Sequence, residues 1–152
     1  MLKIGQKAPE FCLPNEKGDL ISLNDFLGKN VVLYFYPKDN TPGCTKEALA
    51  YKEDFEEYQK LNYEIIGISK DSVNSHKKFS EKYDLPFMLL SDTSLKTLID
   101  YEVWAEKKLY GKTYMGILRT TYVIDKDGII VDVYENVKPD KNSNEILCKI
   151  KF

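Results

Sequence analysis

The chain has 152 residues, which is the size of one ordinary domain. Hydrophobic residues make up 43% of it and charged residues 30%, a composition that excludes disordered and fibrous classes. The formal net charge is −2, so the chain lacks the excess positive charge expected of a protein that binds nucleic acid or acidic lipid.

The apolar runs and the cysteines indicate a cytoplasmic protein. The longest apolar run, Val31 to Tyr36, is too short to cross a membrane, and the first residues lack the apolar segment of a signal peptide. Three widely spaced cysteines, Cys12, Cys44 and Cys148, do not resemble a disulfide framework. No pair is spaced as C-x-x-C and His76 has no nearby cysteine, so we expect no metal site.

The N-terminal part predicts a β-hairpin and a helical turn. Two short apolar stretches between Phe11 and Leu23 flank a polar turn that ends at Gly18, which is typical of a hairpin. Asn24 then suits the N-cap of a short helical turn that ends at Gly28.

A strand followed by a helix is expected next. Val31 to Tyr36 is β-branched and aromatic on both faces, which predicts a central strand buried on both sides. Thr41 suits an N-cap and Pro42 the first position of a helix. The helix is supported by apolar residues at helical spacing, namely Ala48, Tyr51, Phe55, Tyr58 and Leu61.

The middle of the chain repeats this alternation. Glu64 to Ser69 predicts a second strand and Val73 to Tyr83 a second helix, so the two strands should be joined by a right-handed parallel crossover. A third strand near Phe87 to Leu90 and a helix over Leu95 to Ile99 follow.

The C-terminal part predicts an irregular stretch, a hairpin and a short helix. Val103 to Gly116 is rich in aromatic residues and Lys; we expect its aromatic side chains to pack under a loop, or else to rim the active site. Thr120 to Asp125 and Ile129 to Tyr134 flank a polar turn and predict a hairpin. A final helix is expected around Asn144 to Lys149.

Cys44 is the first candidate functional residue. It lies just after Pro42 and Gly43, in the first turn of the predicted helix. Free backbone N–H groups and the positive end of the helix dipole favour a thiolate there, as a nucleophilic cysteine requires. The alternative is that Cys44 is a small hydrophobic residue in a turn.

Arg119 is the second candidate, because it is the one arginine among 22 Lys and Arg residues. A chain that otherwise uses Lys suggests that a planar, permanently charged side chain is required at this place. The alternative is a surface Arg or an ordinary ion pair. His76, beside Ser75 on the second predicted helix, is interpreted as a surface or packing residue and not as a catalytic base.

The stretch Tyr34 to Ala48 resembles the active-site signature of peroxiredoxins, P-x-x-x-T-x-x-C, with Pro37, Thr41 and Cys44 at the fixed positions. It is most similar to the bacterioferritin comigratory protein, or peroxiredoxin Q, subfamily. Four further stretches carry the same resemblance, which spans nearly the whole chain: Ala8 to Phe11, Ile68 to Phe79, Glu106 to Arg119, and Thr121 to Asp125.

The resemblance implies one thioredoxin-like α/β domain over residues 1–152, with a central mixed sheet flanked by helices. It also implies reduction of hydrogen peroxide and organic hydroperoxides by a peroxidatic cysteine without any cofactor. Cys44 would attack the peroxide and become a sulfenic acid. Thr41 would bond the sulfur or the peroxide, Pro37 would shield the pocket, and Arg119 would stabilise the thiolate and the leaving oxygen.

Two further residues are assigned to the substrate site. The N–H groups of Gly43 and Cys44 suit the peroxide oxygens. Glu47, one helical turn beyond Cys44, would orient Arg119; a solvated helix face is the equally good alternative.

The chain departs from the subfamily at Leu49, where many members carry a resolving cysteine. Cys12 and Cys148 remain as candidate resolving residues, with Cys148 slightly favoured because chain ends are mobile. We therefore expect a one-cysteine cycle completed by an external thiol, either thioredoxin or a small molecule. The resemblance to the subfamily also implies a monomer.

Two other classes of function stay open at this level. A dithiol oxidoreductase of the thioredoxin type is disfavoured because C-x-x-C is absent. A redox sensor or a binding module on the same fold would share the Cys44 motif without turning over peroxide.

Overall fold

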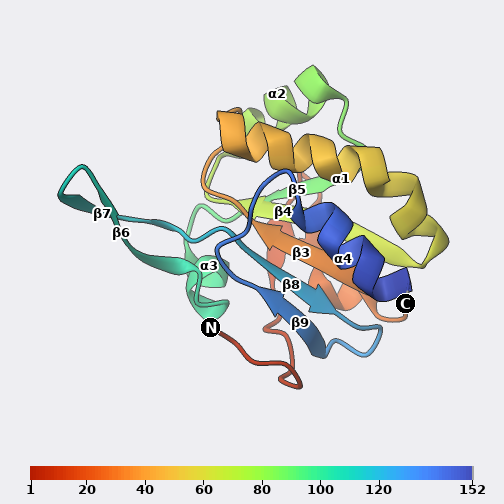
Figure 1. Ribbon diagram of the computed structural model, residues 1–152. Coiled ribbons are helices and arrows are strands. Elements are labelled where there is room, and N and C mark those ends of the chain that lie inside the picture. The colour runs from red at the N-terminus through yellow and green to blue at the C-terminus, as the bar shows by residue number, and fades with distance from the viewer. Residues whose placement is uncertain (152) are drawn as a thin grey trace.

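A five-stranded mixed sheet forms the centre of the protein (Figure 1). The computed structural model describes residues 1–151. The strand order is β5-β4-β3-β8-β9, with β3 and β5 each parallel to β4, β8 antiparallel to β3, and β9 antiparallel to β8. The strands are β3 (Asn30–Phe35), β4 (Tyr63–Ser69), β5 (Met88–Ser91), β8 (Thr120–Ile124) and β9 (Ile130–Tyr134). This arrangement confirms the predicted mixed α/β fold, the parallel β3–β4 pair and the C-terminal hairpin.

Strand β3 is buried on both faces, as its composition predicts. Val31, Leu33 and Phe35 point into one apolar core, while Val32 and Tyr34 point into the other. Because successive side chains alternate across a strand, one short segment contributes to both cores.

Helices cover both faces of the sheet (Figure 1). One face carries α1, α2 and α4, and the other carries the 3₁₀ helix η1 and α3. Their bounds are η1 (Leu23–Phe26), α1 (Pro42–Lys60), α2 (Val73–Tyr83), α3 (Lys96–Asp100) and α4 (Asn142–Lys151). None of the helices within residues 1–151 is long and apolar enough to cross a membrane.

The N-terminal hairpin is confirmed, but the cap of the following helical turn is not the predicted one. Strands β1 (Cys12–Pro14) and β2 (Leu20–Ser22) pair antiparallel. The helical turn is η1, and Ser22 is its N-cap because the Asp25 carboxylate accepts a hydrogen bond from the Ser22 N–H at 2.9 Å. The prediction that Asn24 is the cap was wrong, since Asn24 lies inside the turn.

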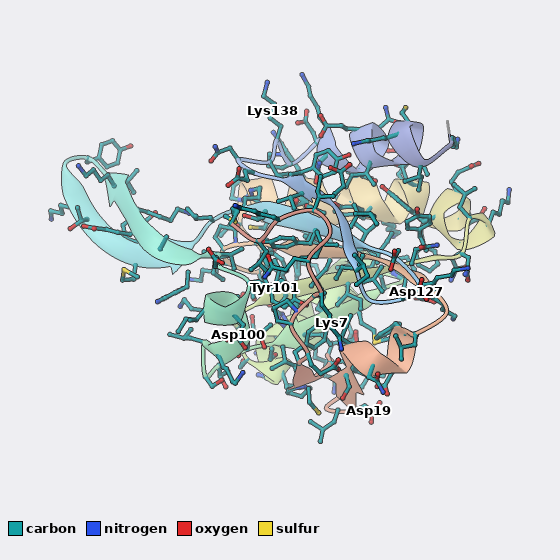
Figure 2. The ribbon with its side chains drawn as sticks, turned by 90° about the horizontal axis from the view of Figure 1, so that it is seen from below. Lys7, Asp19, Asp100, Tyr101, Asp127 and Lys138 are labelled. Atoms are coloured by element: carbon teal, nitrogen blue, oxygen red, sulfur yellow. The ribbon has the colours of Figure 1, made fainter. Side chains whose placement is uncertain are left out.

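The prediction of an irregular stretch before Arg119 was also wrong. Strands β6 (Trp104–Leu109) and β7 (Lys112–Ile117) form a separate antiparallel hairpin that projects from the body of the molecule (Figures 1 and 2). Tyr110 and Gly111 connect the strands, and both have positive φ, as a tight two-residue hairpin turn requires. Tyr is an unusual residue for that position, which is why the turn was missed.

The aromatic residues of this hairpin do not pack under a loop. Tyr110 is 96% exposed and Tyr114 is also exposed, whereas Trp104 is half-buried against the core. The expectation that these aromatic side chains pack under a loop was therefore wrong for the two tyrosines.

Candidate active site

Cys44 lies in the first turn of α1, the helix that follows β3 in the chain after a short loop. Thr41 is the N-cap in an extended conformation and Pro42 occupies the first helical position, as the sequence predicts. The first N–H groups of a helix have no partner within it, so the amides of Gly43 and Cys44 are available to a ligand. Cys44 itself is only 1% exposed, so its sulfur is shielded from bulk water.

Arg119 is the residue just before β8, and its side chain extends to Cys44. Its Nη2 lies 3.4 Å from Sγ of Cys44, and its Nη1 lies 2.8 Å from Oε1 of Glu47. The guanidinium therefore faces a sulfur and a carboxylate that lie one helical turn apart on α1. The structure brings together three of the residues that the sequence analysis had placed in the site, namely Cys44, Glu47 and Arg119.

Burial and the neighbouring groups together shift the pKa values of Glu47 and Arg119. Burial raises the pKa of Glu47 to about 7, although the adjacent Arg119 acts in the opposite direction. Oε2 of Glu47 has no hydrogen-bond partner among the described residues. Burial disfavours the charge of Arg119, but Glu47 and Cys44 outweigh it and raise the pKa of Arg119 above its usual value. Arg119 is thus a permanent cation beside the sulfur.

Thr41 and Pro37 lie in the loop between β3 and α1. Oγ1 of Thr41 donates a hydrogen bond to the carbonyl oxygen of Lys38 at 2.8 Å. Its hydroxyl hydrogen is therefore used within the loop, and its oxygen keeps lone pairs that can accept a hydrogen bond from a ligand. Pro37 is half-buried at the end of β3.

The side chain of Arg119 passes close to the backbone of Gly43. A Cβ atom at this position would lie 3.2 Å from Nη2 of Arg119 and 3.6 Å from Cγ of Pro139. Pro139, in the segment between β9 and α4, was not singled out from the sequence. A proline among surface residues gives no signal of its position until the fold is known.

Lys107 is a second residue near the site that sequence analysis did not assign to it. It is half-buried on β6, and its Nζ donates to the carbonyl oxygen of Ile117 at 3.0 Å. Burial and then the charge of Arg119 lower its pKa, while Cys44 acts in the opposite direction. The base of the projecting hairpin therefore adds a second positive charge to the surroundings of Cys44.

The two other cysteines are exposed and free. Cys12 lies on β1 and Cys148 on α4. Leu49, at the position of the subfamily's resolving cysteine, is an exposed residue within α1, which runs without a break from Pro42 to Lys60.

His76 is fully buried, so the surface alternative was wrong and the packing alternative holds. It lies on α2 against the loop that leads to Cys44, and both of its ring nitrogens have polar partners. A lone His on a predicted helix carries no signal that would reveal this.

Known proteins share this sequence and fold. Residues 4–133 match the AhpC/TSA family. The chain is 45% identical over 150 residues to peroxiredoxin Bcp of Bacillus subtilis, covering 99% of this chain and 96% of the relative. It is 40% identical over 150 residues to peroxiredoxin Bcp of Escherichia coli, with the same coverage of both chains.

Solved structures agree. The crystal structure of a PrxQ mutant from Xylella fastidiosa superposes with a TM-score of 0.94 at 32% identity, covering 99% of this chain and 96% of that one. The bacterioferritin comigratory protein of Xanthomonas campestris, studied for its alkyl peroxide reduction activity, superposes with a TM-score of 0.88 at 35% identity, covering 93% and 90%. The chain therefore belongs to the AhpC/TSA family, among relatives named peroxiredoxin Bcp and peroxiredoxin Q.

Proposed function

We propose that the protein is a thiol-dependent peroxidase that reduces hydrogen peroxide and organic hydroperoxides through Cys44. The observation that carries the proposal is the contact of 3.4 Å between Nη2 of Arg119 and Sγ of Cys44 at the N-terminus of α1. A permanent cation and free amide N–H groups next to a sulfur are the surroundings that a nucleophilic cysteine requires, and the thiolate is the form that attacks peroxide.

The reaction divides into an oxidation and a reduction. The Cys44 thiolate attacks the terminal oxygen of the peroxide, so that an S–O bond forms as the O–O bond breaks. The sulfur loses two electrons and becomes a sulfenic acid, while the leaving oxygen takes up a proton and departs as water or alcohol. One thiol then converts the sulfenic acid to a mixed disulfide and releases water. A second thiol frees Cys44 and leaves with the first as a disulfide.

Arg119 and Thr41 have complementary roles in the first step. Charge builds up on the leaving oxygen as the O–O bond breaks, and the guanidinium next to Sγ is placed to stabilise it. Thr41 accepts a hydrogen bond from the peroxide, because its own hydroxyl hydrogen is donated to the carbonyl oxygen of Lys38. The amides of Gly43 and Cys44 bind the peroxide oxygens, Glu47 fixes the guanidinium, and Pro37 limits the access of water.

The proposal extends to the reductant and the setting. Since residue 49 is Leu and offers no thiol, the sulfenic acid is reduced by an external thiol, either thioredoxin or a small molecule. The three free cysteines suit a reducing compartment such as the cytoplasm. We propose that the enzyme is a monomer consisting of one domain.

A comparison of cysteine variants tests the assignment. Cys44→Ser should abolish fast oxidation by hydrogen peroxide in a stopped-flow experiment, whereas Cys12→Ser and Cys148→Ser should each keep it. Sustained peroxide consumption with added thiol distinguishes an enzyme from a sensor that reacts once. Fast oxidation that persists in Cys44→Ser would overturn the assignment.

A further inference from the structure

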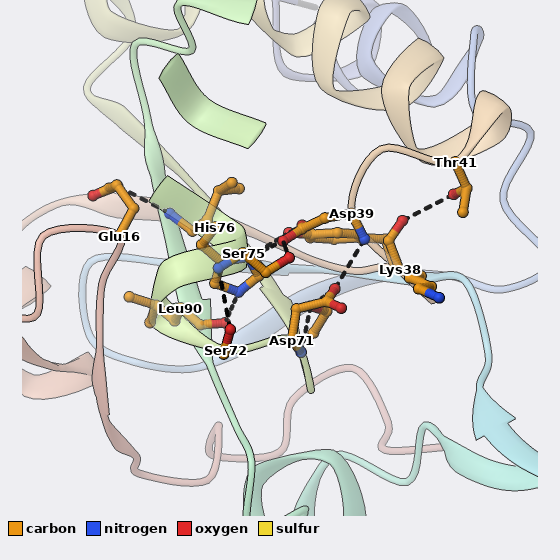
Figure 3. A network of polar contacts seen from close by, with 12 residues as sticks. Glu16, Lys38, Asp39, Thr41, Asp71, Ser72, Ser75, His76 and Leu90 are labelled. Atoms are coloured by element: carbon orange, nitrogen blue, oxygen red, sulfur yellow. Dashed lines mark hydrogen bonds and ion pairs between the residues drawn. The ribbon is translucent and has the colours of Figure 1, made fainter. Parts of the chain in front are cut away.

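The one histidine of the chain lies in a buried polar network beside the loop that leads to Cys44 (Figure 3). Nδ1 of His76 lies 2.7 Å from Oδ2 of Asp39, and Nε2 lies 2.9 Å from the carbonyl oxygen of Leu90 on β5. A carbonyl oxygen can only accept a hydrogen bond, so Nε2 carries a proton. His76 thereby links β5 to the β3–α1 loop through its two ring nitrogens.

Asp39 is the point in the loop where these contacts converge. The Tyr36 hydroxyl donates to Oδ1 at 2.6 Å and the Ser75 hydroxyl donates to Oδ2 at 2.8 Å. Burial and then the charge of Asp39 raise the pKa of Tyr36 well above its usual value, so Tyr36 stays a donor. A buried carboxylate is tolerated only with such partners, which ties its position to theirs.

The backbone of the loop is held at the same place. The N–H of Asp39 donates to Oδ2 of Asp71 at 2.9 Å. Asn40, the next residue, has φ of 59° in the left-handed region, and its Oδ1 accepts from Lys82 and Tyr83 of α2. A residue other than glycine keeps that conformation only where its surroundings hold it. The loop is therefore fixed to α2 at two successive residues.

The fixed part of the loop leads directly into the reacting groups. Thr41 follows Asn40, caps α1, and closes the loop by its bond to Lys38. The free amides and Cys44 lie in the next turn. A shift of Asp39 therefore moves the groups that receive the peroxide while leaving the body of α1 in place.

The same atoms are arranged as a hydrogen-bond network. One ligand atom from each of Asp39, Asp71 and His76 lies within 4.8 Å of the others. Nδ1 of His76 and Oδ2 of Asp39 lie 2.7 Å apart, which is a hydrogen-bond distance.

We propose that His76 and Asp39 form a positioning pair that holds the β3–α1 loop, and with it Thr41 and the first turn of α1, in the arrangement that receives the peroxide. This inference rests on the proposed peroxidase function, because the arrangement serves that reaction. Neither residue touches the peroxide; His76 acts through Asp39, and Asp39 acts through the backbone.

The variants His76→Gln and Asp39→Asn test the pair. Misplacement of the loop by a fraction of an ångström to an ångström should slow Cys44 oxidation by hydrogen peroxide by up to about a hundredfold. Alkylation of Cys44 by iodoacetamide, followed by peptide mass spectrometry, should change far less, since it needs the thiolate but not the peroxide-binding groups. Because the two residues act as one unit, the double variant should be no slower than the slower single variant.

Asp92→Asn is the matched control. Asp92 is fully buried, and its carboxylate accepts from the N–H of Leu98 and the hydroxyl of Ser94, away from the loop. Its replacement should reduce the free energy of unfolding without slowing peroxide reduction. Equal slowing in Asp92→Asn, or an unchanged peroxide rate in folded His76→Gln and Asp39→Asn, would overturn the proposal.

Two measurements keep the outcome decisive. If the buried variants do not fold, Ser75→Ala removes one bond to Asp39 from a half-buried position and should slow the peroxide reaction by a smaller factor; no slowing there would count against the pair. Amide hydrogen exchange at residues 38–44 should accelerate in all three variants. A wild type inert to peroxide would refute the proposed function, whereas unchanged exchange in the variants would refute the positioning pair.

Discussion

Arg119 and Cys44 lie 75 positions apart in the chain, and Nη2 of the first lies 3.4 Å from Sγ of the second. Two different elements create this contact. The first turn of α1 presents the sulfur, and the segment entering β8 presents the guanidinium, with β8 paired directly to the strand that feeds α1. Because β3 and β8 are neighbours in the sheet, the cation and the nucleophile are held by the rigid part of the fold.

Arg119→Lys should slow peroxide reduction even though it keeps the positive charge. The single ammonium nitrogen of a lysine cannot occupy the positions of both Nη1 and Nη2, so one charge-assisted hydrogen bond of the transition state is lost. Such a loss costs about 1.5–3 kcal/mol, or roughly ten- to a hundredfold in the second-order rate constant. Stopped-flow oxidation by hydrogen peroxide measures it.

Arg119→Ala separates charge from geometry. It should slow the reaction further than Arg119→Lys does, because the cation that stabilises the leaving oxygen is lost as well. Wild-type rates in Arg119→Lys would show that charge alone suffices. An unchanged rate in Arg119→Ala would remove Arg119 from the site.

Much of this site could be predicted from the sequence because its signals are local. Pro42 and Cys44 mark a helix start, and Arg119 stands out as the one arginine. The His76–Asp39 pair could not be predicted, since its contacts depend on how α2 packs against the loop. Periodicity places His76 on a helix but does not tell which buried partner the helix meets.

The fold was predictable for the same reason, and its prediction was wrong where local signals were weak. Continuous apolar strands such as β3 and helices with a clear start signal, such as Pro42 in α1, were identified correctly. The β6–β7 hairpin was missed because both of its faces carry polar residues. In addition, its turn has Tyr110 at a position where Asn, Asp or Gly is usual. Hydrophobic alternation is visible only where one face is buried.

Gly43→Ala should lower activity without lowering stability. The added Cβ would lie 3.2 Å from Nη2 of Arg119 and push the guanidinium away from Sγ. Gly43 lies in α1, where alanine is favoured over glycine by up to about 1 kcal/mol, so the free energy of unfolding should not fall. Opposite trends in rate and stability support the crowding; a wild-type rate would contradict it.

Peroxide should leave Cys44 as a sulfenic acid, or as a mixed disulfide with added thiol. Residue 49 is Leu, and residues five apart on an intact helix such as α1 are separated by about 7.5 Å along its axis. Peptide mapping without reduction, after one equivalent of peroxide, checks the product. A dominant bond from Cys44 to Cys148 or to Cys12 would contradict a one-cysteine cycle.

Over-oxidation is the corollary of that cycle. With no internal thiol to trap the sulfenic acid, a second peroxide should convert Cys44 to the sulfinic acid. Mass spectrometry at increasing peroxide, with and without added thiol, should show this product suppressed by the thiol. Resistance to excess peroxide in the absence of thiol would indicate an internal resolving residue.

Glu47 should make stability depend on pH in a direction opposite to that of most acidic groups. Its pKa rises on folding from 4.5 to about 7, mainly through burial, so the folded state binds the proton more tightly than the unfolded chain does. Between these pH values the unfolded state holds fewer protons, and the contribution of Glu47 to the free energy of unfolding therefore falls as pH rises. The full change is on the order of 3 kcal/mol and is complete above about pH 7.

Glu47→Gln cannot titrate, so the difference in unfolding free energy between wild type and this variant, from urea titrations at pH 4.5 to 8, isolates the effect. The free energy of unfolding of the wild type should fall relative to that of the variant as pH rises across this range, and the difference should then level off. A flat difference would show that Arg119 keeps Glu47 ionised throughout, and that the guanidinium is shared permanently between a carboxylate and the sulfur.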